Sequence, residues 1–240
     1  MPPPTRLVRF VEAMSLVYGP LTHLTPATAA SWTPPANPGA GGHRGRYLWT
    51  DAFGVLNLIT LHRETSDVVY LAAARRLVET VHDVLGRQRG DGNDDDNDNT
   101  KKPDRLPGAT DAEPLAGGLR IGKREATGPD GDGQYHHYLT LWMFALNRLA
   151  LAVGDDDGGA GARYNELAVQ LARAIHPHFV LRGDRDDSLR MVWKVSTDLR
   201  AVLVPSEGHL DAATGYVVYR LLQEAAVHRT TAASCPARAS

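Results

Sequence analysis

Apolar residues recur at intervals of three and four positions along much of the chain, with polar residues between them. This period is typical of helices that bury one face. Gly86 and Pro177 each stand where we expect such a helix to end. The predicted helices cover residues 5–18, a stretch beginning near Asp51, and residues 68–85, 139–153, 163–177 and 211–226. The sequence RMVWKVS, residues 190–196, has the composition of a strand and predicts a small β-hairpin insertion.

Three stretches lack the helical period. Residues 20–46 are rich in proline, glycine, alanine and threonine, and we expect them to be irregular. Residues 88–105 are acidic, of low complexity and free of large apolar side chains, which predicts a disordered insertion. We therefore divide the chain into an N-terminal helix with an irregular segment (1–46), a helical domain (47–227) and an irregular tail (228–240).

Two of the predicted helical hairpins share a sequence pattern. VLNLITL in the first hairpin resembles ALNRLAL in the second. The second helices of the two hairpins also match at identical spacing, through Tyr70, Ala74, Leu77 and His82 in one and Tyr164, Ala168, Leu171 and His176 in the other. Hairpins of this kind bury their apolar faces by stacking side by side. The sequence therefore predicts an all-α array of hairpins, either an open solenoid or a closed toroid.

Charge and cysteine content exclude several classes of protein. Lysine and arginine number 26 against 28 aspartates and glutamates, and the basic residues are scattered, so we predict neither a nucleic-acid nor a membrane partner. The single cysteine, Cys235, cannot form a disulfide within the chain. Arg6, Arg9 and Glu12 interrupt the apolar run that a signal peptide would need. We therefore expect a soluble, cytoplasmic protein.

The sequence GGLRIGKR, residues 117–124, has the spacing of a phosphate-binding P-loop up to Gly122 and Lys123. Arg124 stands where that motif needs a serine or threonine to hold magnesium, and no strand is predicted ahead of it. We therefore predict no nucleotide or other cofactor. The remaining interpretation is a glycine-rich loop that presents Arg120 and Lys123 to an anionic group of a ligand.

Several histidines raise the question of a metal site. They are His136, His137, His176, His178 and His209, and none has the HExxH spacing or a comparable one. We therefore predict no metal. Because the ordinary pKa of histidine lies near neutrality, a histidine pair could instead serve as acid and base in epimerase or isomerase chemistry.

Four carboxylates lie at or just before predicted helix starts: Asp51, Asp132, Glu207 and Asp211. In an array of alternating hairpins, equivalent helix ends gather at one rim, so these side chains could converge there. Glycosidic cleavage uses two carboxyl groups, one as acid and the other as base or nucleophile. The alternative is that each aspartate is an N-cap that binds the backbone N–H groups of its own helix. We take all four as candidate catalytic residues.

Aromatic and polar residues accompany these acids. Aromatic rings such as those of Tyr47 and Trp49, beside Asp51, suit the apolar faces of sugars. Lys194 lies within an apolar run, and we expect it to be buried with Asp198 or Glu207 as its partner. The predicted substrate-binding residues are Tyr47, Trp49, Arg120, Lys123, Gln134, Tyr135, His136, His137, Trp193, Lys194 and His209.

These stretches together resemble the six-hairpin glycosidase-like proteins of the (α/α)6 toroid superfamily. The resemblance runs in order from about Tyr47 to Ala225 and rests on RYLWTDAFGVLNLITL, GGLRIGK, DGDGQYHHYLTLWMFALNRLA, RAIHPHFV, RMVWKVSTDL and VPSEGHLDAATGYVVYRLLQEA. It implies a ring of helical hairpins, and the superfamily includes glycoside hydrolases, unsaturated-uronide hydrolases and sugar epimerases. The chain offers fewer helices than a full ring needs, so we expect a partial or complete toroid. A partial ring would expose apolar surface and favour self-association.

From these observations we predict a carbohydrate-active protein that binds a small-molecule or oligosaccharide ligand and hydrolyses a glycosidic bond with paired carboxylates. Two alternatives remain open at the level of sequence. One is a sugar epimerase or isomerase, and the other is a non-catalytic scaffold of helical hairpins.

Overall fold

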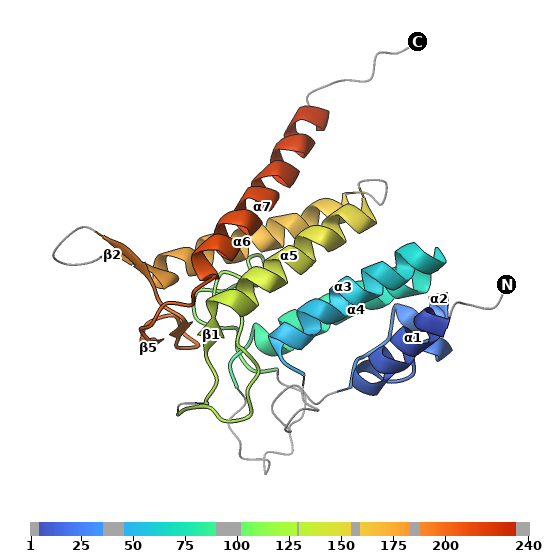
Figure 1. Ribbon diagram of the computed structural model, residues 1–240, viewed down its shortest axis with the longest axis horizontal. Helices are drawn as coiled ribbons and strands as arrows, with labels where there is room; N and C mark the ends of the chain where they lie inside the picture. Colours follow the sequence, from blue (N-terminus) through green and yellow to red (C-terminus); the bar gives the residue numbers. More distant parts are fainter. Residues whose placement is uncertain are drawn as a thin grey trace.

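The computed structural model describes residues 5–35, 46–89, 102–128, 130–154, 159–182 and 188–233. This part of the chain is mostly helical and carries small antiparallel sheets (Figure 1), which confirms the predicted helical class and β insertion. The helices are α1 (Thr5–Tyr18), the short 3-10 helix η1 (Leu21–His23), α2 (Pro26–Ala29), α3 (Leu48–Thr65), α4 (Val68–Leu85), α5 (His136–Val153), α6 (Ala160–Phe179) and α7 (Asp211–Ala233). No helix in the described ranges is long and apolar enough to cross a membrane.

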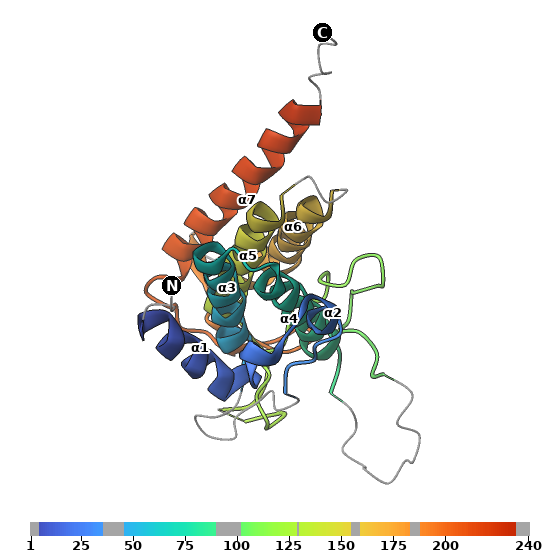
Figure 2. The same cartoon turned by 90° about the vertical axis from the view of Figure 1, so that its right-hand side faces the viewer.

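The four central helices form two hairpins, α3–α4 and α5–α6, and α3 packs against α5 (Figure 2). The turn of the first hairpin needs only two residues. Ser66 adopts a left-handed conformation, with φ of 57°, and Asp67 caps α4 by accepting the backbone N–H of Val69 at 2.9 Å. Helix α7 then packs on α5 and α6, and its C-terminal half extends beyond the other helices.

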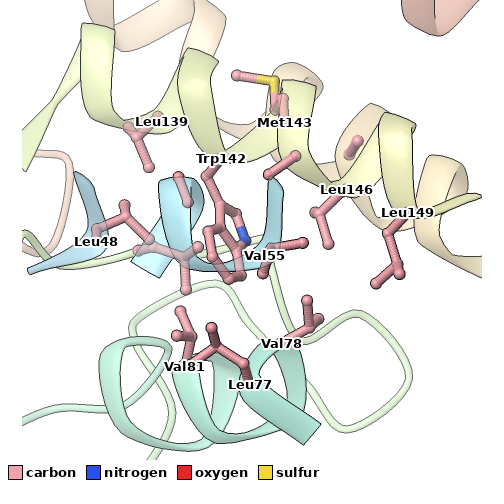
Figure 3. Close-up of a cluster of buried hydrophobic side chains, with 14 of the residues drawn as sticks. Leu48, Val55, Leu77, Val78, Val81, Leu139, Trp142, Met143, Leu146 and Leu149 are labelled. Carbon is pink, nitrogen blue, oxygen red and sulfur yellow. The ribbon is translucent and has the colours of Figure 1, made fainter. Parts of the chain in front are cut away.

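The core lies where the two hairpins meet. Leucines and valines of α3, α4 and α5 surround the indole of Trp142, which is fully buried (Figure 3). Its Nε1 donates to Nε2 of His82 across 3.1 Å, so the largest side chain of the core also has its polar atom satisfied. Residues of α1 and η1, including Met14 and Leu21, join the same core. The N-terminal segment therefore packs on the helical domain.

Two small antiparallel sheets lie near the start of α5. The first has the strand order β1 (Gln134–Tyr135), β4 (Lys194–Val195) and β5 (Val202–Val204), with Gln134 opposite Val195. The second pairs β2 (Val180–Arg182) with β3 (Leu189–Met191). Because β2 continues directly from α6 and β1 leads directly into α5, the sheets bring the segment 189–204 against the ends of both helices.

Three predicted boundaries are wrong. Helix α5 begins at His136, three residues before the predicted start at 139, and its N-cap is Tyr135. Helix α6 continues through Pro177 to Phe179, since a proline in the last turn removes only one backbone hydrogen bond. Helix α7 extends to Ala233, seven residues past the predicted end at 226, whereas residues 234–240 lie outside the described part.

The acidic insertion is also narrower than predicted. Arg87 and Arg105 form an antiparallel bridge, and the N–H of Gln88 donates to the carbonyl of Asp104 at 2.8 Å. The N–H of Leu106 donates in turn to the carbonyl of Gly86 at 3.0 Å. Both flanks of the insertion are thus paired, and the rest of the predicted disordered stretch, residues 90–101, lies outside the described residues.

Candidate functional site

Asp51 and Asp132 are both buried, and neither is an N-cap. The N-caps of α3 and α5 are Tyr47 and Tyr135, and neither tyrosine side chain makes a capping bond. Asp51 lies in the first turn of α3, whereas Asp132 lies in the turn before β1. The capping interpretation of these two aspartates is therefore wrong, and each carboxylate has other partners.

The carboxylate of Asp51 is held by an arginine and a tyrosine. Arg46 donates from Nε to Oδ1 at 2.9 Å and from another guanidinium nitrogen to Oδ2 at 3.0 Å, while the Tyr18 hydroxyl donates to Oδ1 at 3.1 Å. Burial raises the pKa of Asp51, and the bonds from Arg46 and Tyr18 oppose that rise. The bond from Tyr18 ties the start of α3 to the end of α1, and the bidentate pair with Arg46 holds the segment that enters α3.

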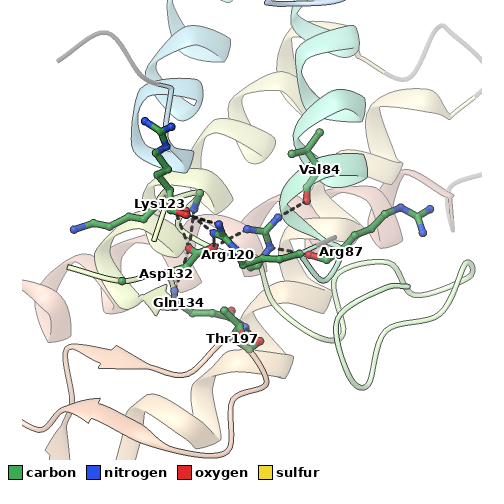
Figure 4. Close-up of polar contacts among 12 residues, drawn as sticks. Val84, Arg87, Arg120, Lys123, Asp132, Gln134 and Thr197 are labelled. Atoms are coloured by element: carbon green, nitrogen blue, oxygen red, sulfur yellow. Dashed lines mark hydrogen bonds and ion pairs between the residues drawn. The ribbon is translucent and has the colours of Figure 1, made fainter. Parts of the chain in front are cut away.

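Asp132 fills a nest made by the glycine-rich loop (Figure 4). Its Oδ1 accepts the backbone N–H groups of Gly122 at 3.0 Å, Gly133 at 3.1 Å and Lys123 at 3.3 Å. Its Oδ2 accepts from Arg120 at 2.5 Å and from Arg89 at 3.3 Å. A side-chain carboxylate therefore takes the N–H donors that a P-loop would offer to phosphate. Both oxygens of Asp132 are thus engaged by groups of the chain itself.

Three predicted binding residues belong to this same framework. Arg120 donates to the carbonyls of Arg87 and Val84 as well as to Asp132 (Figure 4). The amide of Gln134 is fully buried and bridges Leu119, Gly117 and Thr197. Lys194 is buried as predicted, but its ammonium donates to the carbonyl of Gly131 at 2.7 Å, so both predicted carboxylate partners are wrong. All three side chains therefore make hydrogen bonds within the chain.

The other two predicted carboxylates, Glu207 and Asp211, line one cavity of about 390 Å3. It lies between the start of α7, the end of α6 and strands β2 and β3, and we call it the acid–base cavity. His136 of α5 also lines it, as predicted for a binding residue. His176, Tyr216 and Tyr219, which sequence reasoning did not select, also line it, together with Arg190. The volume suits a small-molecule ligand.

Three residues that line this cavity each have a buried polar atom with no hydrogen-bond partner within the described residues: Oδ2 of Asp211, Nδ1 of His136 and the hydroxyl of Tyr219. Asp211 is 4% exposed and His136 is 1% exposed. Buried polar groups are normally hydrogen-bonded, because an unpaired one costs the free energy of its lost hydration. Three such residues around one cavity make it the strongest candidate in the described part of the chain for binding a polar ligand.

Burial also prepares these groups for proton transfer. It raises the pKa of Asp211, which favours the protonated carboxyl, and raises the pKa of Tyr219 to about 12. It lowers the pKa of His136 to about 4, with smaller contributions from His137 and His176. The cavity thus combines a carboxyl group that can donate a proton with a neutral imidazole that can accept a hydrogen bond. Glu207 is exposed, and its Oε1 accepts the N–H of Met191 at 3.1 Å.

Aromatic rings form a second surface beside the cavity. The indoles of Trp49 and Trp193 are 38% and 39% exposed. The ring of Trp193 stacks on Tyr135 at 5.6 Å, and its Nε1 donates to Nδ1 of His137 at 3.0 Å. We define the aromatic cluster as Trp49, Phe53, Tyr135, His137, Tyr138 and Trp193, whose ring centroids lie within 6 Å of a neighbour's. Adjacent residues connect the two surfaces, since His136 lines the cavity and His137 joins the cluster.

The remaining predicted residues lie apart from the cavity. Tyr47 is half-buried at the start of α3, and the ammonium of Lys123 reaches Asp130 at 3.4 Å. His209 is exposed two residues before Asp211. Within the described ranges, no cluster of three histidine, cysteine or carboxylate side chains is placed to hold a metal ion. No known family, curated protein or solved structure matches the chain.

The buried histidine of the cavity predicts acid sensitivity. An unfolded histidine binds a proton near pH 6.5, whereas His136 in the native protein does so near pH 4. Between these values the unfolded state holds the extra proton, so the free energy of unfolding should fall as pH is lowered. The contribution of His136 is about 1.4 kcal/mol per pH unit. Urea denaturation from pH 7.5 to 4.5 measures this slope.

The matched variants are His136→Gln and His23→Gln, because His23 is exposed. The first should lower the slope by about 1.4 kcal/mol per pH unit, because burial also lowers the pKa of His82 and His137, which keep their own contributions, and the second should leave the slope unchanged. Equal slopes in all three proteins would contradict the assignment of this effect to His136.

Proposed function

We propose that the chain is a carbohydrate-active protein that cleaves a glycosidic bond in the acid–base cavity. The observation that supports this most is the unpartnered Oδ2 of Asp211 in a cavity that a second carboxylate, Glu207, also lines. In this proposal the protonated Asp211 gives its proton to the leaving oxygen, and Glu207 acts as base or nucleophile. Asp51 and Asp132 keep their arginine partners and serve the fold.

The aromatic cluster is the proposed platform for the sugar. Its two partly exposed indoles present apolar ring faces of the kind that pack against the C–H groups of pyranose rings, and Tyr135 and His137 stack behind Trp193. The cluster also holds three residues selected from sequence as substrate-binding, in addition to Trp49. We further propose, from the resemblance in sequence, that the two hairpins and α7 are part of an (α/α)6 toroid that self-associates if incomplete.

The proposed reaction predicts a large loss of turnover on removal of either acid. A panel of aryl glycosides and oligosaccharides is first screened for a substrate. Asp211→Asn and Glu207→Gln are then assayed beside the control Glu224→Gln, which changes an exposed carboxylate of α7, the helix that also holds Asp211. We expect the first two to lower kcat by about 100-fold or more, since each removes an acid–base group, and the third to have no effect. Activity should also fall as pH rises through the raised pKa of Asp211, because the acid is then lost. Unchanged kcat in both Asp211→Asn and Glu207→Gln would contradict the assignment of these two residues as acid and as base or nucleophile.

Epimerisation is the second candidate, and a specific observation favours it. His136 and Tyr219 line the same cavity and each has an unpartnered polar atom, and such a pair could move a proton at a sugar carbon. Proton NMR of the products separates the two reactions, since hydrolysis creates a new reducing end and epimerisation does not. Under epimerisation, Tyr219→Phe should lower kcat more than Glu207→Gln does.

A further inference from the structure

A second cavity, of about 410 Å3, lies at the end of α4 beside the glycine-rich loop. Five of its lining residues are cationic: Arg87, Arg89, Arg120, Lys123 and Arg124. Asp83 is the one acid among the described residues that line it. We call it the basic cavity. The described residues that line it are different from those of the acid–base cavity.

The charges around the basic cavity do not balance. Arg89 and Arg120 are engaged by Asp132 and by backbone carbonyls. Lys102 and Arg87 reach Asp83 at 2.8 and 3.7 Å. Counting Lys102 with the five lining cations gives six positive groups, against three carboxylates that contact them, Asp83, Asp130 and Asp132. Among the described residues, three positive groups are therefore left without a carboxylate.

Two side chains carry the unused donors. Nε of Arg87 is buried and has no hydrogen-bond partner among the described residues. The guanidinium of Arg124 makes no hydrogen bond or ion pair with the described part of the chain. Lys123 adds an ammonium whose contact with the exposed Asp130 is long, at 3.4 Å. A buried N–H without an acceptor is costly, so an acceptor is expected at Arg87.

We propose that the basic cavity binds a phosphate group, either as inorganic phosphate or as the phosphate of a small phosphorylated ligand. Guanidinium groups match the geometry of phosphate oxygens, and a doubly charged oxyanion offsets most of the surplus positive charge. The contacts come from side chains at the rim of the loop, because Asp132 already occupies the backbone N–H groups of Gly122 and Lys123. The site is therefore unlike a P-loop, although it uses the same glycine-rich segment.

Calorimetric titration at low ionic strength tests this proposal, with inorganic phosphate as the first probe and a hexose monophosphate as the second. We expect saturable binding with one site per chain. Arg124→Gln and Lys123→Gln should each weaken the affinity about tenfold, and 0.5 M sodium chloride should weaken it further. The control is Arg9→Gln, which removes an exposed arginine of α1 and should leave the affinity unchanged. Tighter binding of the hexose monophosphate would assign the site to a phosphorylated ligand, and equal affinities would assign it to free phosphate.

Two results would overturn the proposal. The first is the absence of saturable binding, or binding that both loop variants retain at full strength. The second concerns Asp91, Asp94, Asp95, Asp96 and Asp98, which follow Arg89 in the sequence. If phosphate binds only after these five aspartates are replaced by asparagine, then the chain's own carboxylates neutralise the cations of the basic cavity, and the native protein has no phosphate site there. The two cavities share no described lining residue. A failure to find glycosidase activity would therefore not decide whether the basic cavity binds phosphate.

Discussion

Replacing Asp132 with alanine should destabilise the protein by about 3–5 kcal/mol, the cost typical of removing one partner from a buried ion pair. The carboxylate accepts two hydrogen bonds from arginines and three from backbone N–H groups. Its loss leaves Arg120, only 7% exposed, without its counter-charge. Urea denaturation followed by circular dichroism measures the change in the free energy of unfolding.

Chemical rescue separates this explanation from a general loss of packing. Formate or acetate at tens of millimolar should bind the empty nest of Asp132→Ala and recover part of its lost stability. Neither anion should stabilise the native protein in this way, because the carboxylate of Asp132 already fills the nest. Asp130→Ala is the matched control, because Asp130 is exposed and makes only the long contact with Lys123. A loss below about 1 kcal/mol in Asp132→Ala would show that the nest does not hold the loop.

Replacing Trp142 with alanine should cost a similar amount, about 3–5 kcal/mol, because it opens a cavity in the centre of the core. The indole is fully buried among side chains of α3, α4 and α5. Burial lowers the pKa of His82 to about 3, which keeps that imidazole neutral and able to accept the indole N–H. The substitution therefore also leaves Nε2 of His82 without its donor. Thermal and urea denaturation measure the loss.

Two further variants divide the Trp142 effect into its parts. Trp142→Phe retains most of the ring volume and removes the hydrogen bond, so it should cost less, about 1–3 kcal/mol. Trp49→Ala removes an indole that is 38% exposed, and its cost should be smaller than that of Trp142→Ala. If Trp49→Ala proved as damaging as Trp142→Ala, the aromatic cluster would be part of the stability core and a poorer candidate for ligand binding.

The helical class and the positions of α4 and α6 followed from sequence because the apolar period is strong in these two helices. Ala74 and Leu77 of α4 and their repeat partners in α6, Ala168 and Leu171, are all fully buried. Pro177 misled the boundary because a proline near the end of a helix breaks only one backbone bond. The same repeat pairs His82 with His176, yet one is a core hydrogen-bond acceptor and the other lines a cavity.

The carboxylates show where sequence reasoning reaches its limit. Asp51 and Asp132 looked like acids at helix starts, but each has an arginine partner, and Arg120 is twelve positions from the aspartate it binds. Which acid acquires an arginine partner depends on how the loops pack around it. The apolar period of the sequence carries no information about this loop packing. Sequence reasoning did not select Tyr219, which lies within α7. Its unpartnered hydroxyl becomes visible only once the helix is packed on α6.

The paired flanks of the acidic insertion have a practical consequence for engineering. Residues 86–88 and 104–106 are joined by backbone hydrogen bonds, so whatever chain lies between them begins and ends at two fixed, neighbouring points. For such a closed loop, doubling its length costs only about 0.6 kcal/mol of closure entropy. An affinity epitope or a fluorescent reporter can therefore be inserted between residues 89 and 104. The position of α4 should not change, because its packing and the bridge between Arg87 and Arg105 hold it in place.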